Sequence, residues 1–153
     1  TYDIVGDGYN NETDKLLKLS KKLNLLNIVK IHGRIPNTEI KPFFDKCNIG
    51  VSFVPIQDRY EFQPVTKTFE YVMSGLYTIA TCTYENKKVI NDVNGILIKD
   101  SDDDFCRALE FIVKNRDRIS ALDISDTLVN YKWSEIVNNT LYPLLTKLEK
   151  KWF

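Results

Sequence analysis

Residues 67–82, KTFEYVMSGLYTIATC, decide the fold class because they join a short helix to a β-branched strand through one glycine. The pattern predicts a helix over residues 66–74, and Gly75 is the residue type that commonly ends a helix. Residues 77–81 then predict a buried strand. The apolar side chains expected on the buried face of the helix are Phe69, Val72 and Met73.

The alternation of strands and helices continues on both sides of this stretch. Further strands are predicted at residues 2–5, 28–31, 49–54 and 95–98. Leucines 16, 19, 23 and 26 have helical spacing and predict a further helix. Other helices are predicted over residues 37–47, from Ser101 onwards, and over about residues 133–150. Pro42 fits the helix at 37–47 only if it lies in the first turn. Such alternation predicts an α/β fold, a Rossmann-like doubly wound parallel sheet with helices on both faces. The length of 153 residues predicts a single domain over residues 1–153.

The charge balance and the cysteines exclude several function classes. Lys plus Arg equal Asp plus Glu at 21 each, so no global field favours nucleic acid or a membrane surface. No apolar run has membrane-spanning length. Cys47, Cys82 and Cys106 are far apart, and with His32 as the single histidine they form no zinc pattern. We interpret them as buried, reduced thiols of a cytoplasmic protein, and the chain that starts at Thr1 as a piece of a longer protein.

Ligands of parallel α/β sheets bind beyond the carboxyl ends of the strands. Here those ends are residues 6–8, 32–34, 55–65 and 81–83. Residues 55–65 form a loop that is long for a compact α/β unit, and long loops are more often functional. Because the formal net charge is zero, any anion site in this region must be a local one.

Lys67 and Glu70 allow two interpretations. On a helix surface, residues three apart can form an ion pair that contributes a few tenths of a kcal/mol. Alternatively, Lys67 lies in the first helical turn, where unbonded N–H groups and the helix dipole attract phosphate. Glu70 lies one turn further and could accept hydrogen bonds from ribose hydroxyls. In the second interpretation the helix binds a ligand that contains phosphate and sugar.

Other polar residues also have two interpretations. Arg59 and Glu61 lie in the long loop, either as ligand contacts or as solvated charges, and Phe62 either packs on a ligand or on the loop itself. Arg34 follows a strand end, where it either binds phosphate or covers the edge of the sheet. His32 has neither a nucleophile nor a metal partner in the pattern, which favours a structural position.

Two short motifs have structural explanations. Gly6-Asp7-Gly8 starts like a dinucleotide fingerprint, but it lacks the third glycine and the later acidic residue. It predicts a tight turn and argues against a dehydrogenase. The acidic run 102–104 follows Ser101 and predicts a helix capping box rather than a metal cluster.

Five ordered motifs together resemble the C-terminal, donor-binding domain of retaining GT-B glycosyltransferases of the group 1, glycogen-synthase-like kind. They are IVGDG at 4–8, VKIHGRIPNTEIKPFFDKCNIGVSFVP at 29–55, PVTKTFEYVMSGLYTIAT at 64–81, NGILIKDSDDDFCRAL at 94–109 and YKWSEIVNNTLYPLL at 131–145. The resemblance covers nearly the whole chain. It implies transfer of a sugar with retention from a UDP- or GDP-sugar, with no metal ion or other cofactor.

The resemblance also implies roles for single residues. Glu70 matches the second glutamate of the family's E-x7-E signature, which binds the ribose. Lys67 would lie near the diphosphate and stabilise it as a leaving group, and Glu61 approximates the first glutamate, which contacts the transferred sugar. Backbone near Arg34 and Ile35 would face the base. The implied donor site is completed by Gly8, Thr66 and Phe62.

The sequence departs from the family pattern at four places, one of which is a lysine, Lys87 or Lys88, where the family has an acidic residue before Asn-Gly. Eight residues rather than seven separate Glu61 from Glu70. Val65 stands where the family has a proline before the helix, and Pro64 comes one place early. Tyr77 replaces a second proline of the pattern.

The resemblance implies partners beyond this chain. A sugar or lipid-linked acceptor would bind an N-terminal domain that the chain lacks, and the first strand of the donor domain would precede Thr1. The parent enzyme would make glycans or cell-surface polysaccharide in the cytoplasm, or peripherally at the inner face of the membrane, and the isolated chain would be inactive. Two other classes stay open, a noncatalytic Rossmann-like module that binds a nucleotide or a protein, and a sugar-nucleotide epimerase.

Overall fold

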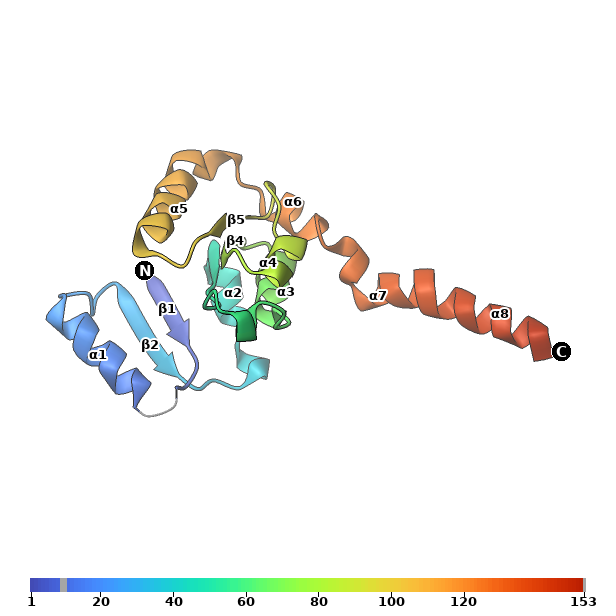
Figure 1. Ribbon diagram of the computed structural model, residues 1–153, viewed down its shortest axis with the longest axis horizontal. Coiled ribbons are helices and arrows are strands. Elements are labelled where there is room, and N and C mark those ends of the chain that lie inside the picture. Colours follow the sequence, from blue (N-terminus) through green and yellow to red (C-terminus); the bar gives the residue numbers. More distant parts are fainter. Residues whose placement is uncertain (9–10, 153) are drawn as a thin grey trace. The chain divides into compact units, whose positions relative to one another are not determined.

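The computed structural model describes residues 1–8 and 11–152, with side chains as far as residue 148 (Figure 1). The contacts divide the chain into two compact units, Thr1–Lys46 and Cys47–Phe153. Each unit contains parallel strands that alternate with helices, so the predicted α/β class is confirmed. The prediction of a single domain over residues 1–153 stays a prediction.

The first unit is a parallel strand pair with a helical crossover. Strands β1 (Tyr2–Val5) and β2 (Val29–Gly33) pair with Tyr2 opposite Val29, and helix α1 (Glu12–Lys22) connects them. A short 3-10 turn η1 (Asn37–Glu39) and helix α2 (Lys41–Lys46) follow. Pro42 is the second residue of α2, as predicted, where its missing N–H leaves no helical bond unmade.

A polar cluster links three elements of the first unit. His32 Nε2 lies 2.6 Å from Asp3 Oδ1, and Lys46 Nζ lies 3.6 Å from the same oxygen. The Asp3 side chain is only 8% exposed. The hydrogen bond from His32 is the main reason that the pKa of Asp3 lies below its usual 3.8, and the charge of Lys46 acts in the same direction.

The second unit contains a three-stranded parallel sheet in the order β3 (Ile49–Ser52), β4 (Tyr77–Thr81) and β5 (Gly95–Ile98). Helix α3 (Thr66–Met73) connects β3 to β4, and helix α4 (Tyr84–Val89) lies between β4 and β5. The helical elements after β5 are α5 (Asp102–Asn115), η3 (Arg116–Arg118), α6 (Ala121–Asp126), η4 (Val129–Tyr131), α7 (Trp133–Ile136), the π-helical turn η5 (Val137–Leu141) and α8 (Tyr142–Trp152).

The core of the second unit is built around the central strand. Every residue of β4 is buried. Val72 of α3, Ile112 of α5 and Ile124 of α6 are also buried and belong to the same hydrophobic cluster. Gly75 permits the tight return from α3 to β4, because its φ of 78° is left-handed and a Cβ atom would lie 2.8 Å from the Ala121 carbonyl oxygen.

Several predicted boundaries agree with the structure. Residues 2–5, 77–81 and 95–98 form strands with the predicted bounds. Ser101 caps α5 by accepting a hydrogen bond from the Asp104 amide, which confirms the predicted capping box start. The expected C-terminal helix is also present, but it is interrupted by the π-helical turn η5.

Other predictions were wrong. Helix α1 ends at Lys22, so Leu23 and Leu26 lie beyond it, and they are 54% and 49% exposed. Met73 is 37% exposed, whereas its neighbour Val72 in the same last turn of α3 is fully buried. The cysteines are not buried as predicted, since Cys47 and Cys82 are half-buried and Cys106 is exposed on α5.

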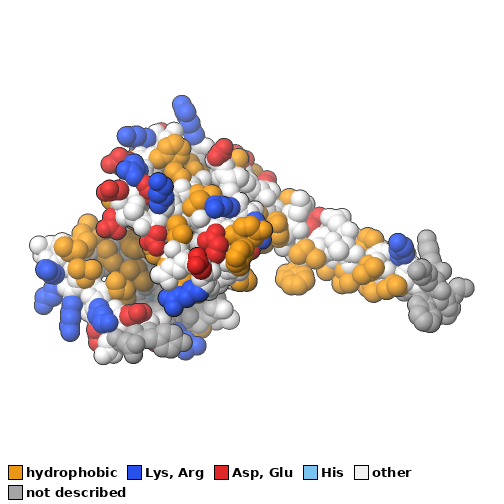
Figure 2. All heavy atoms as spheres, viewed as in Figure 1, with side chains coloured by type: hydrophobic (Ala, Val, Ile, Leu, Met, Phe, Trp, Pro, Cys, Tyr) orange, Lys and Arg blue, Asp and Glu red, His pale blue; other side chains and the backbone are white. Residues whose placement is uncertain are grey.

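The C-terminal helical stretch carries many exposed apolar side chains. They include Trp133, Leu141, Tyr142, Leu144 and Leu145, and hydrophobic side chains are visible along this stretch in Figure 2. Among the residues that the structure describes, no helix is both long enough and apolar enough to cross a membrane.

The Asp3 cluster generates a pH-dependent prediction. Asp3→Asn should lower the free energy of unfolding by about 1–3 kcal/mol near pH 7, because a hydrogen bond to a charged group is lost. Since the pKa of folded Asp3 lies below 3.8, this contribution is present above pH 3.8 and is lost as the pH falls through the folded value. Urea unfolding of both proteins at about pH 7 and about pH 2 measures the difference. Asp14→Asn on α1 is the matched control, and an equal effect of Asp3→Asn at both pH values would contradict the assignment.

Candidate functional site

The carboxyl edge of the three-stranded sheet carries a shallow depression. Because β3, β4 and β5 are parallel and in register, their carboxyl ends lie at one edge. The depression has a volume of about 380 Å³ and is formed by the end of β3, the long loop and the start of α3. It is lined by Phe53, Val54, Pro55, Tyr60, Gln63, Pro64, Val65, Thr66 and Lys67.

A chain of buried hydrogen bonds supports this depression from the core. The hydroxyls of Ser52 on β3 and Thr68 on α3 are 2.6 Å apart, and Thr68 donates to Asn86 Oδ1 on α4 at 2.8 Å. Because the single hydroxyl hydrogen of Thr68 goes to Asn86, Ser52 must be the donor to Thr68. The Asn86 amide then donates to the Thr81 carbonyl oxygen at 2.9 Å. The bonds therefore tie four different elements together.

Thr81 closes the ring of buried bonds at the depression itself. Its hydroxyl donates to the Val54 carbonyl oxygen at 2.6 Å and accepts from the Val54 amide at 2.9 Å. Val54 is two residues beyond Ser52 in the chain, so the bonds return to the extension of β3 where they began. We call Ser52, Thr68, Asn86, Thr81 and Val54 the buried polar ring. Its four polar side chains are fully buried, and among the described residues no buried side-chain polar atom lacks a partner.

Lys67 lies at the edge of the depression and does not form the ion pair with Glu70. Its ammonium instead donates a hydrogen bond to the Phe53 carbonyl oxygen at 2.8 Å. The side chain is half-buried, and this burial lowers its pKa below 10.5. No acidic side chain among the described residues pairs with it. Because an ammonium has three donors, two remain for an anionic ligand.

The start of α3 offers further donors beside Lys67. Val65, the N-cap residue, provides no side-chain bond to the first turn, and Thr66 is exposed. The first amides of a helix have no intrahelical partner, and with the helix dipole they attract anions. Glu70 lies one turn further along and is exposed, and in the described part of the chain no side chain pairs with its carboxylate. The structure thus places Thr66, Lys67 and Glu70 together on α3.

The other predicted site residues of the second unit, Arg59, Glu61 and Phe62, lie in the long loop. The loop contains the 3-10 turn η2 (Asp58–Tyr60). Arg59 folds back on its own loop, because its guanidinium lies 4.5 Å from the Tyr60 ring and its Nε donates to Gln57. Glu61 is half-buried and follows this turn directly. Phe62 is 66% exposed and lies against Tyr84 of α4 rather than in the depression.

Three predicted site residues belong to the first unit. Gly8 follows β1, and its amide donates to the Asp7 carboxylate at 3.0 Å. Arg34, which is exposed, and Ile35, which is half-buried, follow Gly33 at the end of β2. Each of the three therefore follows the carboxyl end of a strand. Their predicted meeting with Lys67 and Glu70 stays a prediction.

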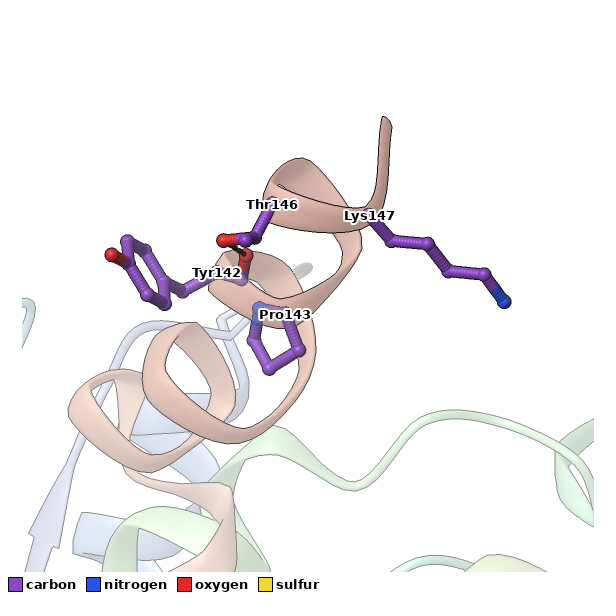
Figure 3. Close-up of a pocket in the computed structure, with 4 residues that line it drawn as sticks. All are labelled: Tyr142, Pro143, Thr146 and Lys147. Atoms are coloured by element: carbon purple, nitrogen blue, oxygen red, sulfur yellow. Dashed lines mark hydrogen bonds between the residues drawn. The ribbon is translucent and has the colours of Figure 1, made fainter. Parts of the chain in front are cut away.

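A second depression lies on α8 and differs from the first. Figure 3 shows that its four lining residues, Tyr142, Pro143, Thr146 and Lys147, all come from one helix, with the Thr146 hydroxyl bonded to the Tyr142 carbonyl oxygen at 3.0 Å. No predicted site residue lies there. A depression on a single exposed helix surrounds a ligand poorly, so we place the candidate site at the sheet edge.

Asn86 and Thr81 were missed by sequence reasoning. The sequence analysis predicts no helix around Asn86, whereas residues Tyr84–Val89 form α4. A signal was available, since Thr83 is a helix-capping residue type and its hydroxyl accepts from the Asn86 amide at 3.4 Å. Within the described residues, no group of three His, Cys, Asp or Glu side chains could hold a metal ion, and the expectation of metal-free chemistry stays a prediction.

The family model for Glycosyl transferases group 1 matches residues 1–115. No curated protein sequence matches the chain.

Solved structures with a similar fold include HepE of Anabaena and a sucrose-phosphate synthase. HepE of Anabaena in complex with UDP-glucose has a TM-score of 0.71 at 17% identity, over 96% of this chain and 41% of the HepE chain. The same protein in complex with UDP has a TM-score of 0.68. Sucrose-phosphate synthase of Thermosynechococcus elongatus has a TM-score of 0.67 at 17% identity, over 95% of this chain and 38% of that chain. These likenesses confirm the predicted Rossmann-like fold, and the chain spans 41% of the HepE length.

The buried polar ring generates a stability prediction. Thr68→Val keeps the shape of the side chain but leaves both Ser52 and Asn86 short of a partner, so the free energy of unfolding should fall by about 2–4 kcal/mol. Thr68→Ser keeps the hydroxyl and is the matched control, with an expected loss of about 1 kcal/mol for the methyl group. Urea unfolding followed by circular dichroism measures both. Equal losses for the two variants would show that the hydrogen bonds do not matter.

Proposed function

Because the chain belongs to the group 1 glycosyltransferases, we propose that it binds the nucleotide-sugar donor of a retaining glycosyltransferase. The observation that carries the proposal is the state of Lys67. It is a half-buried cation at the start of α3, oriented by the Phe53 carbonyl and unpaired with any described carboxylate. A diphosphate would supply the missing negative charge.

Different residues of α3 bind the diphosphate and the ribose of the nucleotide. Lys67 and the first-turn amides, with Thr66, bind the diphosphate and stabilise the negative charge that develops as it leaves the sugar. Glu70 accepts hydrogen bonds from the ribose hydroxyls. Basic groups and a helix N-terminus already supply positive charge, so the proposed transfer needs no metal ion.

The loop and the first unit supply the other contacts. Glu61, with Phe62 beside it, contacts the transferred sugar, while Gly8, Arg34 and Ile35 contact the phosphate and the base. Complexes of the structurally similar HepE contain UDP and UDP-glucose, which supports a uridine nucleotide as the first ligand to test before GDP. The identity of 17% between this chain and HepE is too low to assign the sugar of the donor.

The proposal for the whole enzyme extends beyond this chain. We expect a sugar or lipid-linked acceptor to bind an N-terminal domain, and the enzyme to act in polysaccharide synthesis in the cytoplasm or at the inner membrane face. An isolated donor domain cannot exclude water from the cleft, so we expect it to bind donor without transferring sugar.

Lys67 generates the first binding prediction. Lys67→Met keeps the apolar stem but removes the charge, so the Kd for UDP, measured by calorimetry, should rise about 10- to 100-fold. Because burial lowers the pKa of Lys67, the affinity of the wild-type chain should begin to fall at a lower pH than an ordinary lysine titrates. Lys114→Met on α5 is the control. Unchanged UDP affinity in Lys67→Met would refute the phosphate assignment, and no binding of UDP or GDP to the wild-type chain would favour a module for another ligand.

Glu70 generates a prediction about the ribose. Glu70→Gln should raise the Kd for UDP about tenfold, because an amide is a weaker acceptor than a carboxylate. The same substitution should have a smaller effect on binding of 2′-deoxy-UDP, which keeps the 3′-hydroxyl but lacks the 2′-hydroxyl that Glu70 would bind. Calorimetry of both ligands with both proteins forms a double-mutant cycle. An equal effect on the two nucleotides would mean that Glu70 does not contact the 2′-hydroxyl.

A further inference from the structure

Two aromatic side chains meet on the surface beside the long loop. Phe62 of the loop is 66% exposed and Tyr84, the first residue of α4, is 46% exposed. Their ring centroids are 5.0 Å apart at an angle of 58°, which is a favourable tilted arrangement. Both rings therefore bury part of their surface against each other.

The contact between Phe62 and Tyr84 joins residues 61–63 of the loop to α4. The hydrogen bonds in this part of the loop otherwise stay within the loop. The Tyr60 amide bonds to the Gln57 carbonyl and the Gln63 amide to the Tyr60 carbonyl, both within the loop. The loop is fixed at other points as well: near its start the Ile56 amide donates to Asp100 at 3.3 Å, and Tyr60 packs against the hydrophobic core. For the described residues 61–63, the contact between Phe62 and Tyr84 is the specific interaction that reaches another element.

Tyr84 is the fixed member of the pair. It directly follows Thr83, the fully buried cap of α4, and two residues later comes Asn86 of the buried polar ring. Lys88 Nζ also lies 4.1 Å from the centre of the Tyr84 ring, and Glu85 holds that ammonium at 2.7 Å. The backbone and the ring of Tyr84 are thus held from two directions, whereas Phe62 depends on Tyr84.

We propose that Tyr84 is a positioning residue that, through Phe62, holds Glu61 in place to contact the sugar of the donor. The inference rests on the proposed function. It assigns Tyr84 to selection of the sugar and not to nucleotide binding, because Lys67 and Glu70 lie on α3, where the buried polar ring holds them. Loosening of the loop therefore weakens the contact with the sugar and leaves the contacts with the diphosphate and ribose intact.

The test compares two ligands and two substitutions of the same residue. Calorimetry gives the Kd of the wild-type chain for UDP and for UDP-glucose. The Kd for UDP divided by the Kd for UDP-glucose reports the contribution of the sugar to binding. Tyr84→Ala should lower this ratio about as far as Glu61→Ala does and leave the Kd for UDP within about twofold. Tyr84→Phe keeps the ring and should keep the ratio. Phe111→Ala, which removes an exposed ring on α5, is the control.

A second measurement needs no ligand. Amide hydrogen exchange of residues 61–63, followed by NMR, should become several-fold faster in Tyr84→Ala and not in Tyr84→Phe, because only the first variant releases the ring of Phe62. Amides of α3 should exchange at the wild-type rate in both variants, which also shows that the chain remains folded.

The outcomes separate this inference from the proposed function. If the wild-type chain binds neither ligand, the proposed function fails, and the exchange rates alone decide whether Tyr84 positions the loop. If both ligands bind, the inference is overturned by equal binding of UDP and UDP-glucose to the wild type, by equal losses for both ligands in Tyr84→Ala, or by unchanged exchange at residues 61–63.

Discussion

The buried polar ring is the constraint on which the candidate site depends. Ser52, Thr68, Asn86 and Thr81 come from four elements, and each bond satisfies a group that would otherwise be buried without a partner. A single unsatisfied group of this kind costs about 1–3 kcal/mol, so the ring is favourable only when all four elements are in place. The packing of Val72 in the core already restricts shifts of α3 against the sheet, and the ring adds hydrogen bonds whose lengths and angles have a narrow range. Together, the core and the ring set the position of α3.

The chemistry of Lys67 follows from that position. With α3 fixed and Val54 bonded to Thr81, the Phe53 carbonyl points at the Lys67 ammonium. Partial burial of an ammonium costs free energy, and one neutral carbonyl offsets only part of that cost. An anion at the start of the helix would offset more of it. It would also meet the amides of Thr66 and Lys67, whereas the Thr68 amide already donates to the Val65 carbonyl oxygen at 2.9 Å. The same burial that weakens the charged state of Lys67 thus strengthens its attraction for a diphosphate.

The sequence predicted the strands better than it predicted the site. Residues 77–81 and 95–98 were predicted with their observed bounds because apolar, β-branched runs between turn residues define them sharply. Helix α4 is only six residues long, too short for a helical period to be recognised, so Asn86 was missed. The ring itself could not be predicted, because Ser, Thr and Asn are common surface residues and only tertiary packing pairs them. Glu70 and Lys67 were predicted as site residues because helical spacing and the family pattern agree on them, and their roles stay predictions.

The eight-residue spacing between Glu61 and Glu70 can be explained through Val65. Glu70 is fixed by α3, which begins at Thr66, so an additional residue must be accommodated before the helix. Pro64 stands one place earlier than in the family pattern, and Val65, the residue between it and the helix, is 5% exposed within the hydrophobic core. Val65 is therefore the additional residue, and its side chain packs in the core. As a result, Pro64 and the loop before it lie one residue further along the chain from the start of α3. Helix α3 then no longer determines where the Glu61 carboxylate lies, and its position depends on what holds the loop itself.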